Sequence, residues 1–346
     1  KLNIHKNSYS TQLKNSIIMI KFLPKKLDLF LRNLRALKES FKSYLYDYLR
    51  FSKYSIKKTF PDDKTQLQSK IISLYHVLEK GLIMPKTRLG YGNERILQLI
   101  QLLKIYKTKF NSNSSVHYNS ALKVLISYVD IHSKTKIDTT YIQDFLRENS
   151  PQNSINGGYY DLDLKLFTEK SKGNFVDLCQ IRNSVRNFSD KQVNVVDIKE
   201  AIKIAQSSPS TCNRQSSRVY LIEDKSKMEK VLELQSGSRG FADKIDKLLM
   251  ISYDIKSYQG SGDRNTGYID SSLFAMTLIY ALTFLGIGTV SLNWSKSKEL
   301  DLKLRQVVSI EKSHNVVFFI GLGHLNKTTK IAVSARHKTE DILICL

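Results

Sequence analysis

The sequence predicts a chain in two parts, an all-helical N-terminal extension over residues 1–155 and a domain of mixed α and β structure over residues 156–346. In the first part, apolar residues recur at intervals of three and four, which is the spacing of one helix face. In the second part, short apolar runs bounded by turn residues stand between helical segments, as in layered helices and strands. The chain has 346 residues, of which 41% are hydrophobic and 25% charged, which is the composition of a globular protein.

Charge is the outlier of the composition. The chain carries 54 Lys and Arg against 32 Asp and Glu, a net charge of +22. The first 60 residues hold 14 of the cations and three of the anions, a net +11 that is half of the excess. Nucleic acid and an anionic membrane surface are the general partners of such an excess. Because half of the charge lies in a terminal appendage, we expect the chemistry elsewhere in the chain.

The first predicted element is a long helix over residues 25–52. Its apolar residues alternate at spacings of three and four, namely Leu27, Phe30, Leu34, Leu37, Phe41, Tyr44, Tyr48 and Phe51. This is a seam of the a/d type and predicts a helix packed against another helix, with Lys and Arg on its other faces. A membrane-surface helix and a nucleic-acid arm are the alternatives.

Three more helices are predicted in the extension. Their apolar faces are Leu67, Ile71, Leu74 and Leu78; then Ile96, Leu99, Leu103 and Tyr106; then Leu122, Leu125 and Val129. The Gly- and Pro-containing stretch Gly81–Gly92 predicts a loop between the first two. The turn-rich stretch 150–158 predicts a linker, with the domain boundary between it and Asn174.

Beyond the boundary, helices and strands are expected to mix. Asp197 and Glu200 have the spacing of a capping box that opens a helix through Ala205. Short apolar runs predict the strands Val219–Ile222, Leu248–Ser252, Thr289–Leu292 and Val316–Ile320. The segment Tyr268–Leu285 is apolar almost all round, which predicts a buried helix that ends with Gly286 in the C′ position.

The cysteine and histidine content points away from metal and disulfide chemistry. The three cysteines form no CxxC pair, which favours a reduced, cytoplasmic compartment. The seven histidines form no HExxH motif, so no metal site is expected. No apolar run approaches the roughly 20 residues that span a bilayer. The chain starts without Met and without a signal-peptide core, which leaves open an anchor removed by trimming.

The first chemical motif is Arg182, Ser184 and Arg186. In an extended segment, positions i, i+2 and i+4 point to one face, where two guanidinium groups and a hydroxyl would converge. Arginine offers paired donors and stays charged, so the three side chains form a receptor for a phosphate dianion. A solvated basic strand is the alternative explanation.

Three further motifs follow along the chain. Ser208–Gln215 mixes hydroxyl and amide groups, which suit the edge of a heteroaromatic ring with alternating C=O and N–H groups; the alternative is a polar turn. Gly286, Gly288 and Thr289 let backbone approach a ligand closely, although the dinucleotide fingerprint GxGxxG is missing. Ser334–Lys338 offers Arg336 and Lys338 as another phosphate contact, or is a basic tail.

In this order, the four segments resemble the nitroreductase-like FMN-dependent oxidoreductase family. Arg182–Asp190 matches its Arg-x-Ser-x-Arg-x-Phe element, Ser208–Gln215 its Pro-Ser-x-x-Asn-x-Gln element, Tyr268–Leu292 its central helix with a Gly-x-Gly-Thr exit, and Ala332–Leu343 its closing Arg-x-x-x-Glu segment. The resemblance covers about residues 174–346. Two places depart from it: Ser216-Ser217 replaces a frequent Pro-Trp pair, and Gly323-His324-Leu325 replaces Gly-Tyr-Pro.

A narrower resemblance covers the extension. His76–Leu82 and Pro85–Gly92, together with Asp263–Asn265 and Leu292–Trp294, are similar to nitroreductase-like proteins that carry a helical extension and occur with bacterial surface-polysaccharide genes. This resemblance implies a role in polysaccharide biosynthesis.

The family resemblance implies an α+β fold with a central, mainly antiparallel sheet flanked by helices. It also implies an intertwined homodimer with FMN at the interface. The implied cofactor-binding residues are Arg182, Ser184, Arg186, Pro209, Ser210, Asn213, Gln215, Gly286, Gly288, Thr289, Arg336 and Lys338. No side chain is expected to be catalytic, because the flavin carries the chemistry.

The resulting hypothesis is ping-pong reduction of a small-molecule acceptor by NAD(P)H through FMN. Arg214 and Lys338 are candidates to stabilise the anionic reduced flavin. The candidate substrate residues are His76, Arg88 and Arg214. His76 and Arg88 would line a substrate entrance, with Glu79 and Lys80 beside His76 on one helix face; a surface ion-pair cluster is the alternative.

The competing hypothesis is a non-catalytic or membrane-recruited scaffold of a glycan-assembly complex, held at the inner membrane face by the basic helices. A nucleic-acid partner is not expected, since no zinc finger or RNP-like motif occurs.

Overall fold

The computed structural model describes residues 25–346 except 55, 57, 113–114, 153–156 and 259–260. These residues form two compact units, which are described separately. The first holds the helix α2 (Lys25–Tyr54) and the short segment Tyr258–Asn265; the second holds the remaining described residues, with both the further helices and the sheets.

Helix α2 confirms the predicted helix, but the prediction that its apolar seam packs against another helix is wrong for the described residues. From Leu27 to Tyr48 the seam side chains are between 42% and 68% exposed. The side chain of Phe51 lies outside the described part. The spacing of residues determines which helix face is apolar, but burial of that face requires a second apolar surface from another segment or another molecule. Among the described residues, the seam of α2 is therefore an uncovered apolar face.

An ion pair holds the first unit together. Arg264 donates from Nε to Asp47 Oδ2 at 2.7 Å and from Nη2 to Oδ1 at 3.0 Å. This two-pronged geometry is the strong form of an Arg–carboxylate pair. Arg264 is thus fixed to the C-terminal half of α2.

Four helices open the second unit. They are α3 (Lys64–Leu82), α4 (Asn93–Lys109), α5 (Val116–His132) and α6 (Thr140–Arg147). Asp63 and Ser115 cap α3 and α5 as side-chain acceptors. The predicted apolar faces form the core of this part, with Leu67, Leu99 and Leu122 fully buried. The predicted loop starts at Ile83 rather than Gly81, since α3 continues to Leu82. A Cβ at residue 81 would clash with the Tyr91 ring, so this helical position needs a glycine.

The predicted strands are confirmed and form one antiparallel sheet in the order β2-β3-β5-β4. Their bounds are β2 Ser217–Ile222, β3 Lys247–Asp254, β4 Gly288–Asn293 and β5 His314–Gly323. A second, two-stranded sheet pairs β1 (Tyr159–Asp163) with β6 (Thr328–Ala332) and was not predicted. Part of the predicted linker, residues 153–156, lies outside the described residues. The mainly antiparallel α+β fold is as expected.

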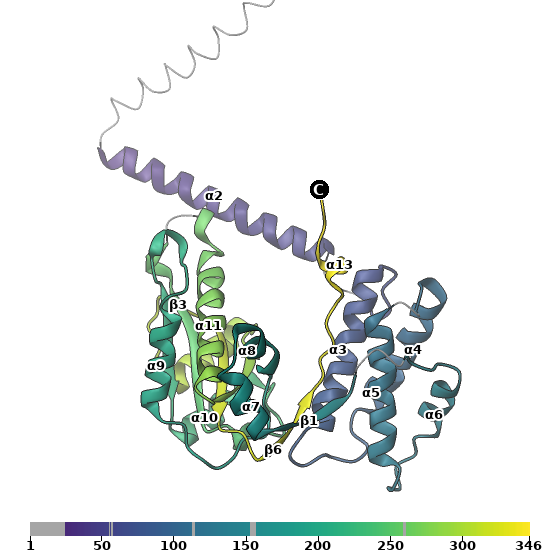
Figure 1. Cartoon of the computed structure of the whole chain (residues 1–346). Coiled ribbons are helices and arrows are strands. Elements are labelled where there is room, and N and C mark those ends of the chain that lie inside the picture. Colours follow the sequence, from purple (N-terminus) through teal and green to yellow (C-terminus); the bar gives the residue numbers. More distant parts are fainter. Residues whose placement is uncertain (1–24, 55, 57, 113–114, 153–156, 259–260) are drawn as a thin grey trace, which may run out of the picture. The chain divides into compact units, whose positions relative to one another are not determined.

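Seven further helices are described in the second unit. Their bounds are α7 (Leu164–Ser171), α8 (Phe175–Ile181), α9 (Val195–Ala205), α10 (Lys225–Gln235), α11 (Thr266–Phe284), α12 (Lys298–Val307) and the short α13 (Thr339–Ile342). Of these, α10 and α11 pack directly on the larger sheet. Figure 1 shows α11 running along α9 and the sheet. The capping-box prediction for α9 is wrong: Asn194 is the cap, with its Oδ1 accepting from Val196 N at 2.9 Å, so the helix begins before Asp197.

Helix α11 is buried on one face only, which corrects the prediction of a helix buried all round. Its opposite face exposes Ile269, Leu273 and Met276. By length and composition Ser261–Phe284 could cross a membrane, contrary to the sequence expectation, but half of its most apolar stretch is buried, as in the core helix of a globular domain. The helix ends as predicted: Gly286, at φ +78°, donates to Thr283 O, and Ile287 donates to Leu282 O.

Candidate functional site

The structure brings two of the sequence motifs side by side. Val185 N donates to Thr289 O at 2.9 Å, and Ser184 forms a parallel bridge with Thr289. The approach is tight, because a Cβ on Gly288 would lie 3.1 Å from Val185 Cγ2. The glycine exit of α11 therefore supports the Arg182–Arg186 segment through its backbone.

A first cavity, of about 500 Å³, lies beside this segment. Arg182 lines it together with Arg336 from the chain that follows β6, and no carboxylate is among its described lining residues. Tyr160 and Cys179 line it too and were missed by the sequence analysis. Burial lowers the pKa of Arg182, with a smaller contribution from the charge of Arg336. Two guanidinium groups that face one cavity without a counter-ion form a receptor for an anion.

Arg186 occupies a different environment from Arg182. It is 7% exposed, and its Nη1 donates to Ser184 O at 3.2 Å. Burial lowers the pKa of Arg186 to about 10, and the carboxylate of Glu79 opposes this shift. Arg186 is not among the residues that line the first cavity. Arg186 is therefore a buried residue that bonds within the Arg182–Arg186 segment and lies near Glu79 of helix α3.

Helix α3 supplies a buried carboxylate next to the motif. Glu79 is fully buried, its Oε2 lies 3.1 Å from His76 Nδ1, and its Oε1 has no hydrogen-bond partner. His76 Nδ1 also lies 3.5 Å from Ser334 Oγ. Burial lowers the pKa of Lys80, and the positive charge of Arg186 contributes a smaller effect in the same direction. The cluster is not the solvated surface pair considered from sequence, because a surface carboxylate would not be buried.

The remaining candidates are the substrate residues Arg88 and Arg214 and the cofactor residue Lys338, and each has its own surroundings. Arg88 is exposed in the loop after α3, where its carbonyl accepts from Tyr91 N. Arg214 Nη1 donates to Ser257 O at 3.1 Å. Lys338 is exposed at the N-cap of α13.

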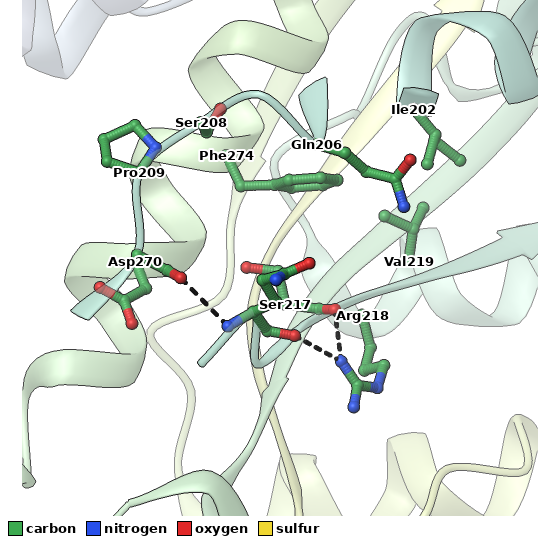
Figure 2. Close-up of a pocket in the computed structure, with 11 residues that line it drawn as sticks. Ile202, Gln206, Ser208, Pro209, Ser217, Arg218, Val219, Asp270 and Phe274 are labelled. Carbon is green, nitrogen blue, oxygen red and sulfur yellow. Dashed lines mark hydrogen bonds between the residues drawn. The ribbon is translucent and has the colours of Figure 1, made fainter. Parts of the chain in front are cut away.

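A second cavity, of about 280 Å³, collects the second motif. Ser208, Pro209, Ser210 and Gln215 line it, and Figure 2 shows Phe274 between Pro209 on one side and Ile202 with Gln206 on the other. Phe274, Asp270 and Arg218 belong to this cavity and were missed by the sequence analysis. The sequence did carry one signal for this cavity, because an acidic residue such as Asp270 is unusual in a strongly apolar helix and indicates a specific polar contact. The first and second cavities share no lining residue.

The loop of the second motif has an unusual backbone. Cys212, Asn213 and Gln215 have φ values of 52°, 53° and 48°, in the left-handed region that non-glycine residues rarely adopt. Asp270 accepts from the backbone and hydroxyl of Thr211 at 3.1 and 3.0 Å, and Ser210 Oγ accepts from Gln215 N at 3.0 Å. Strain of this kind persists only where surrounding bonds impose it and is concentrated at functional sites.

The described residues form an α+β fold with an antiparallel sheet and a cavity lined by Arg182 and Arg336. Residues 180–238 match the model of the nitroreductase family. The family resemblance drawn from the sequence motifs is thereby confirmed over these residues, which contain both the Arg182–Arg186 motif and the Ser208–Gln215 loop.

Solved structures with similar folds cover about half of the chain. A nitroreductase family protein from Streptococcus pneumoniae is 21% identical, covers 50% of this chain and 100% of its own, and has a TM-score of 0.44. An FMN-dependent nitroreductase from Clostridium difficile is 17% identical, covers 44% of this chain and 88% of its own, and has a TM-score of 0.39. No curated protein matches the chain. At these similarities, residue roles have to rest on the geometry of this chain.

Proposed function

We propose that the chain is an FMN-dependent oxidoreductase that uses NAD(P)H to reduce a small-molecule acceptor. The observation that carries the proposal is the pairing of Arg182 and Arg336 in one cavity without a carboxylate. The FMN phosphate is a dianion whose oxygens match two guanidinium forks. The cavity volume of about 500 Å³ is within the range of about 300–1,000 Å³ for ligand pockets. The residues present therefore fit the phosphate end of the cofactor.

The lining of the second cavity suits the isoalloxazine ring of FMN. Hydroxyl and amide groups of Ser208, Ser210 and Gln215 line this cavity and supply both donors and acceptors, whereas Asn213 of the same loop is not among its lining residues. Because the arginines and these residues line separate cavities in one chain, we propose a cofactor site shared between two copies in a homodimer. The exposed apolar face of α11 offers an interface for the second copy.

Bound FMN would supply hydride transfer, by the ping-pong scheme that the resemblance implies. The side chains of this protein would bind and orient the cofactor, with Arg214 and Lys338 as positive charges near the ring. We place the enzyme in the cytoplasm and, on the resemblance of residues 76–92 alone, in surface-polysaccharide biosynthesis.

Reconstitution with FMN tests the proposal. The purified full-length chain is expected to retain FMN through gel filtration and to show a flavin absorption spectrum. Anaerobic addition of NADH or NADPH is expected to bleach that spectrum, and the faster of the two identifies the reductant. Protein that stays colourless after incubation with FMN would contradict the proposal.

Recruitment to a membrane is a second candidate function, favoured by the uncovered apolar face of α2. Phe30, Leu37 and Phe41 on that face are between 60% and 68% exposed. Exposed Arg32, Arg35, Lys38 and Lys42 lie on the same helix. A helix with an apolar face and many cations binds in the interface of an anionic bilayer. A second copy of α2 is the competing occupant, but like charges on two such helices would repel each other.

Vesicle sedimentation tests this second function. The full chain is expected to sediment with vesicles of equal parts phosphatidylglycerol and phosphatidylcholine, and less so in high salt or with phosphatidylcholine alone. Phe41→Glu should weaken binding on the order of tenfold or more, since it removes a buried aromatic group from the lipid contact. Val196→Glu, at an exposed apolar position of α9, is the matched control. Equal sedimentation of both variants, or a dimer dissociated by Phe41→Glu, would overturn lipid binding.

A further inference from the structure

Histidines of helices α3 and α5 contact the segment that carries Arg336, one before and one after the arginine. Ser334 Oγ lies 3.5 Å from His76 Nδ1, and His337 Nδ1 lies 3.0 Å from His117 Nε2. His76 belongs to α3 and His117 to α5. Figure 1 shows the chain after β6 running beside α3. The two contacts lie two residues before Arg336 and one residue after it.

The contact at His337 is backed by a buried tyrosine. Tyr75 Oη lies 2.8 Å from His117 Nδ1, and the two side chains are 1% and 2% exposed. A neutral imidazole has one donor and one acceptor nitrogen, so Tyr75 can donate to His117 Nδ1 while Nε2–H donates to His337. Burial, and next the neighbouring His337, lower the pKa of His117 to about 4, with Asp341 opposing. His117 is therefore neutral near pH 7, as this chain of bonds requires.

The contact at Ser334 is backed by the buried carboxylate. His76 Nδ1 faces Glu79 Oε2 at 3.1 Å, which fixes the imidazole ring against α3. Ser334 itself has φ +49°, and its carbonyl accepts from Arg336 Nη1. A left-handed serine keeps this conformation only where its surroundings impose it. The contact with His76 is one of those constraints.

We propose that His76 and His117 are positioning residues that fix the segment 334–337 so that Arg336 faces Arg182 across the first cavity. The proposal rests on the proposed FMN site, and it assigns the helical region a part in cofactor affinity. The class of ligand concerned is a phosphate-bearing flavin. A phosphate-free flavin would not use Arg336, so its affinity should not depend on the histidines.

Titrations with FMN and riboflavin on the full chain test the proposal. His117→Ala is expected to weaken FMN binding on the order of tenfold, the value of one or two hydrogen bonds, and to leave riboflavin binding unchanged. His117→Gln, which keeps a donor, should restore part of the affinity. His132→Ala is the matched control: His132 is also buried on α5 but contacts Tyr128 O and Gly90 N instead of the segment. A merely structural effect would be shared by this control.

A double-mutant cycle with Arg336→Ala decides whether His117 acts through the arginine. In the Arg336→Ala background, His117→Ala is expected to cause no further loss of FMN affinity. Additive losses, or equal losses for FMN and riboflavin, would overturn the positioning role while leaving the FMN site intact. A wild-type chain that binds no FMN would overturn the proposed function and, with it, this inference.

Discussion

Arg182→Ala is expected to weaken FMN binding on the order of 100-fold. Arg182 faces the first cavity with Arg336, and a phosphate there would receive charge-assisted hydrogen bonds of about 1.5–3 kcal/mol each. Burial already lowers the pKa of Arg182, so the free cation is poorly solvated and gains from an anionic partner. The measurement is the dissociation constant of FMN from quenching of flavin fluorescence.

Two variants sharpen this prediction. Arg182→Lys keeps the charge but loses the planar fork, so it should lie between the wild type and Arg182→Ala. Arg147→Ala removes an exposed arginine of α6 whose partner is Asp144, and it should leave FMN binding unchanged. A change of less than about threefold for Arg182→Ala would place the phosphate elsewhere.

Elements set by local spacing could be predicted from the sequence. The apolar faces of α3, α4 and α5 and the four strands of the larger sheet were predicted because each depends on residues close together in the chain. The exit of α11 at Gly286 was also predictable, because only a residue that tolerates positive φ suits that position.

Features set by distant partners were not predictable. On α2 and α11, the spacing shows which helix face is apolar, but it does not show whether another part of the protein packs against that face. Strand β1 pairs with β6 between distant parts of the chain, from Tyr159 with Ala332 to Asp163 with Thr328. Short strands with many polar residues carry little sequence signal for β structure. Asn194 and Asp197 are both good caps, and only the start of the hydrogen-bond ladder decides between them.

The same limit applies to the candidate site. The motifs gave the residue types, but Arg182 and Arg186 were expected to converge, whereas Arg182 lines the cavity and Arg186 is buried near Glu79. The carboxylate of Glu79, on a helix of the extension, acts electrostatically on Arg186, and no spacing within residues 182–186 encodes this neighbour. Likewise, the separation of the phosphate residues from Gln215 depends on the tertiary fold.

The second large effect is expected in the core behind the arginine motif. Phe188 is 1% exposed, and a Cβ on Gly323 would lie 2.5 Å from its ring. Phe188→Ala should lower the free energy of unfolding by about 3–5 kcal/mol, from lost burial and the cavity left behind. The single tryptophan, Trp294, belongs to the same core and packs against Phe319, so its fluorescence in urea follows this unfolding. Phe175→Ala, at a 68% exposed position, is the control and should change stability by less than about 1 kcal/mol.

Gly323→Ala tests the same packing from the other side. Its new methyl group would collide with the Phe188 ring and should cost about 1–3 kcal/mol. In the Phe188→Ala background the ring is gone, so Gly323→Ala should cost less there, and the two losses should not add. Strict additivity would show that the ring and the glycine do not share one space. Because Ser189 N donates to His324 O at 2.8 Å next to this contact, loss of the packing should also loosen the motif that holds Arg182.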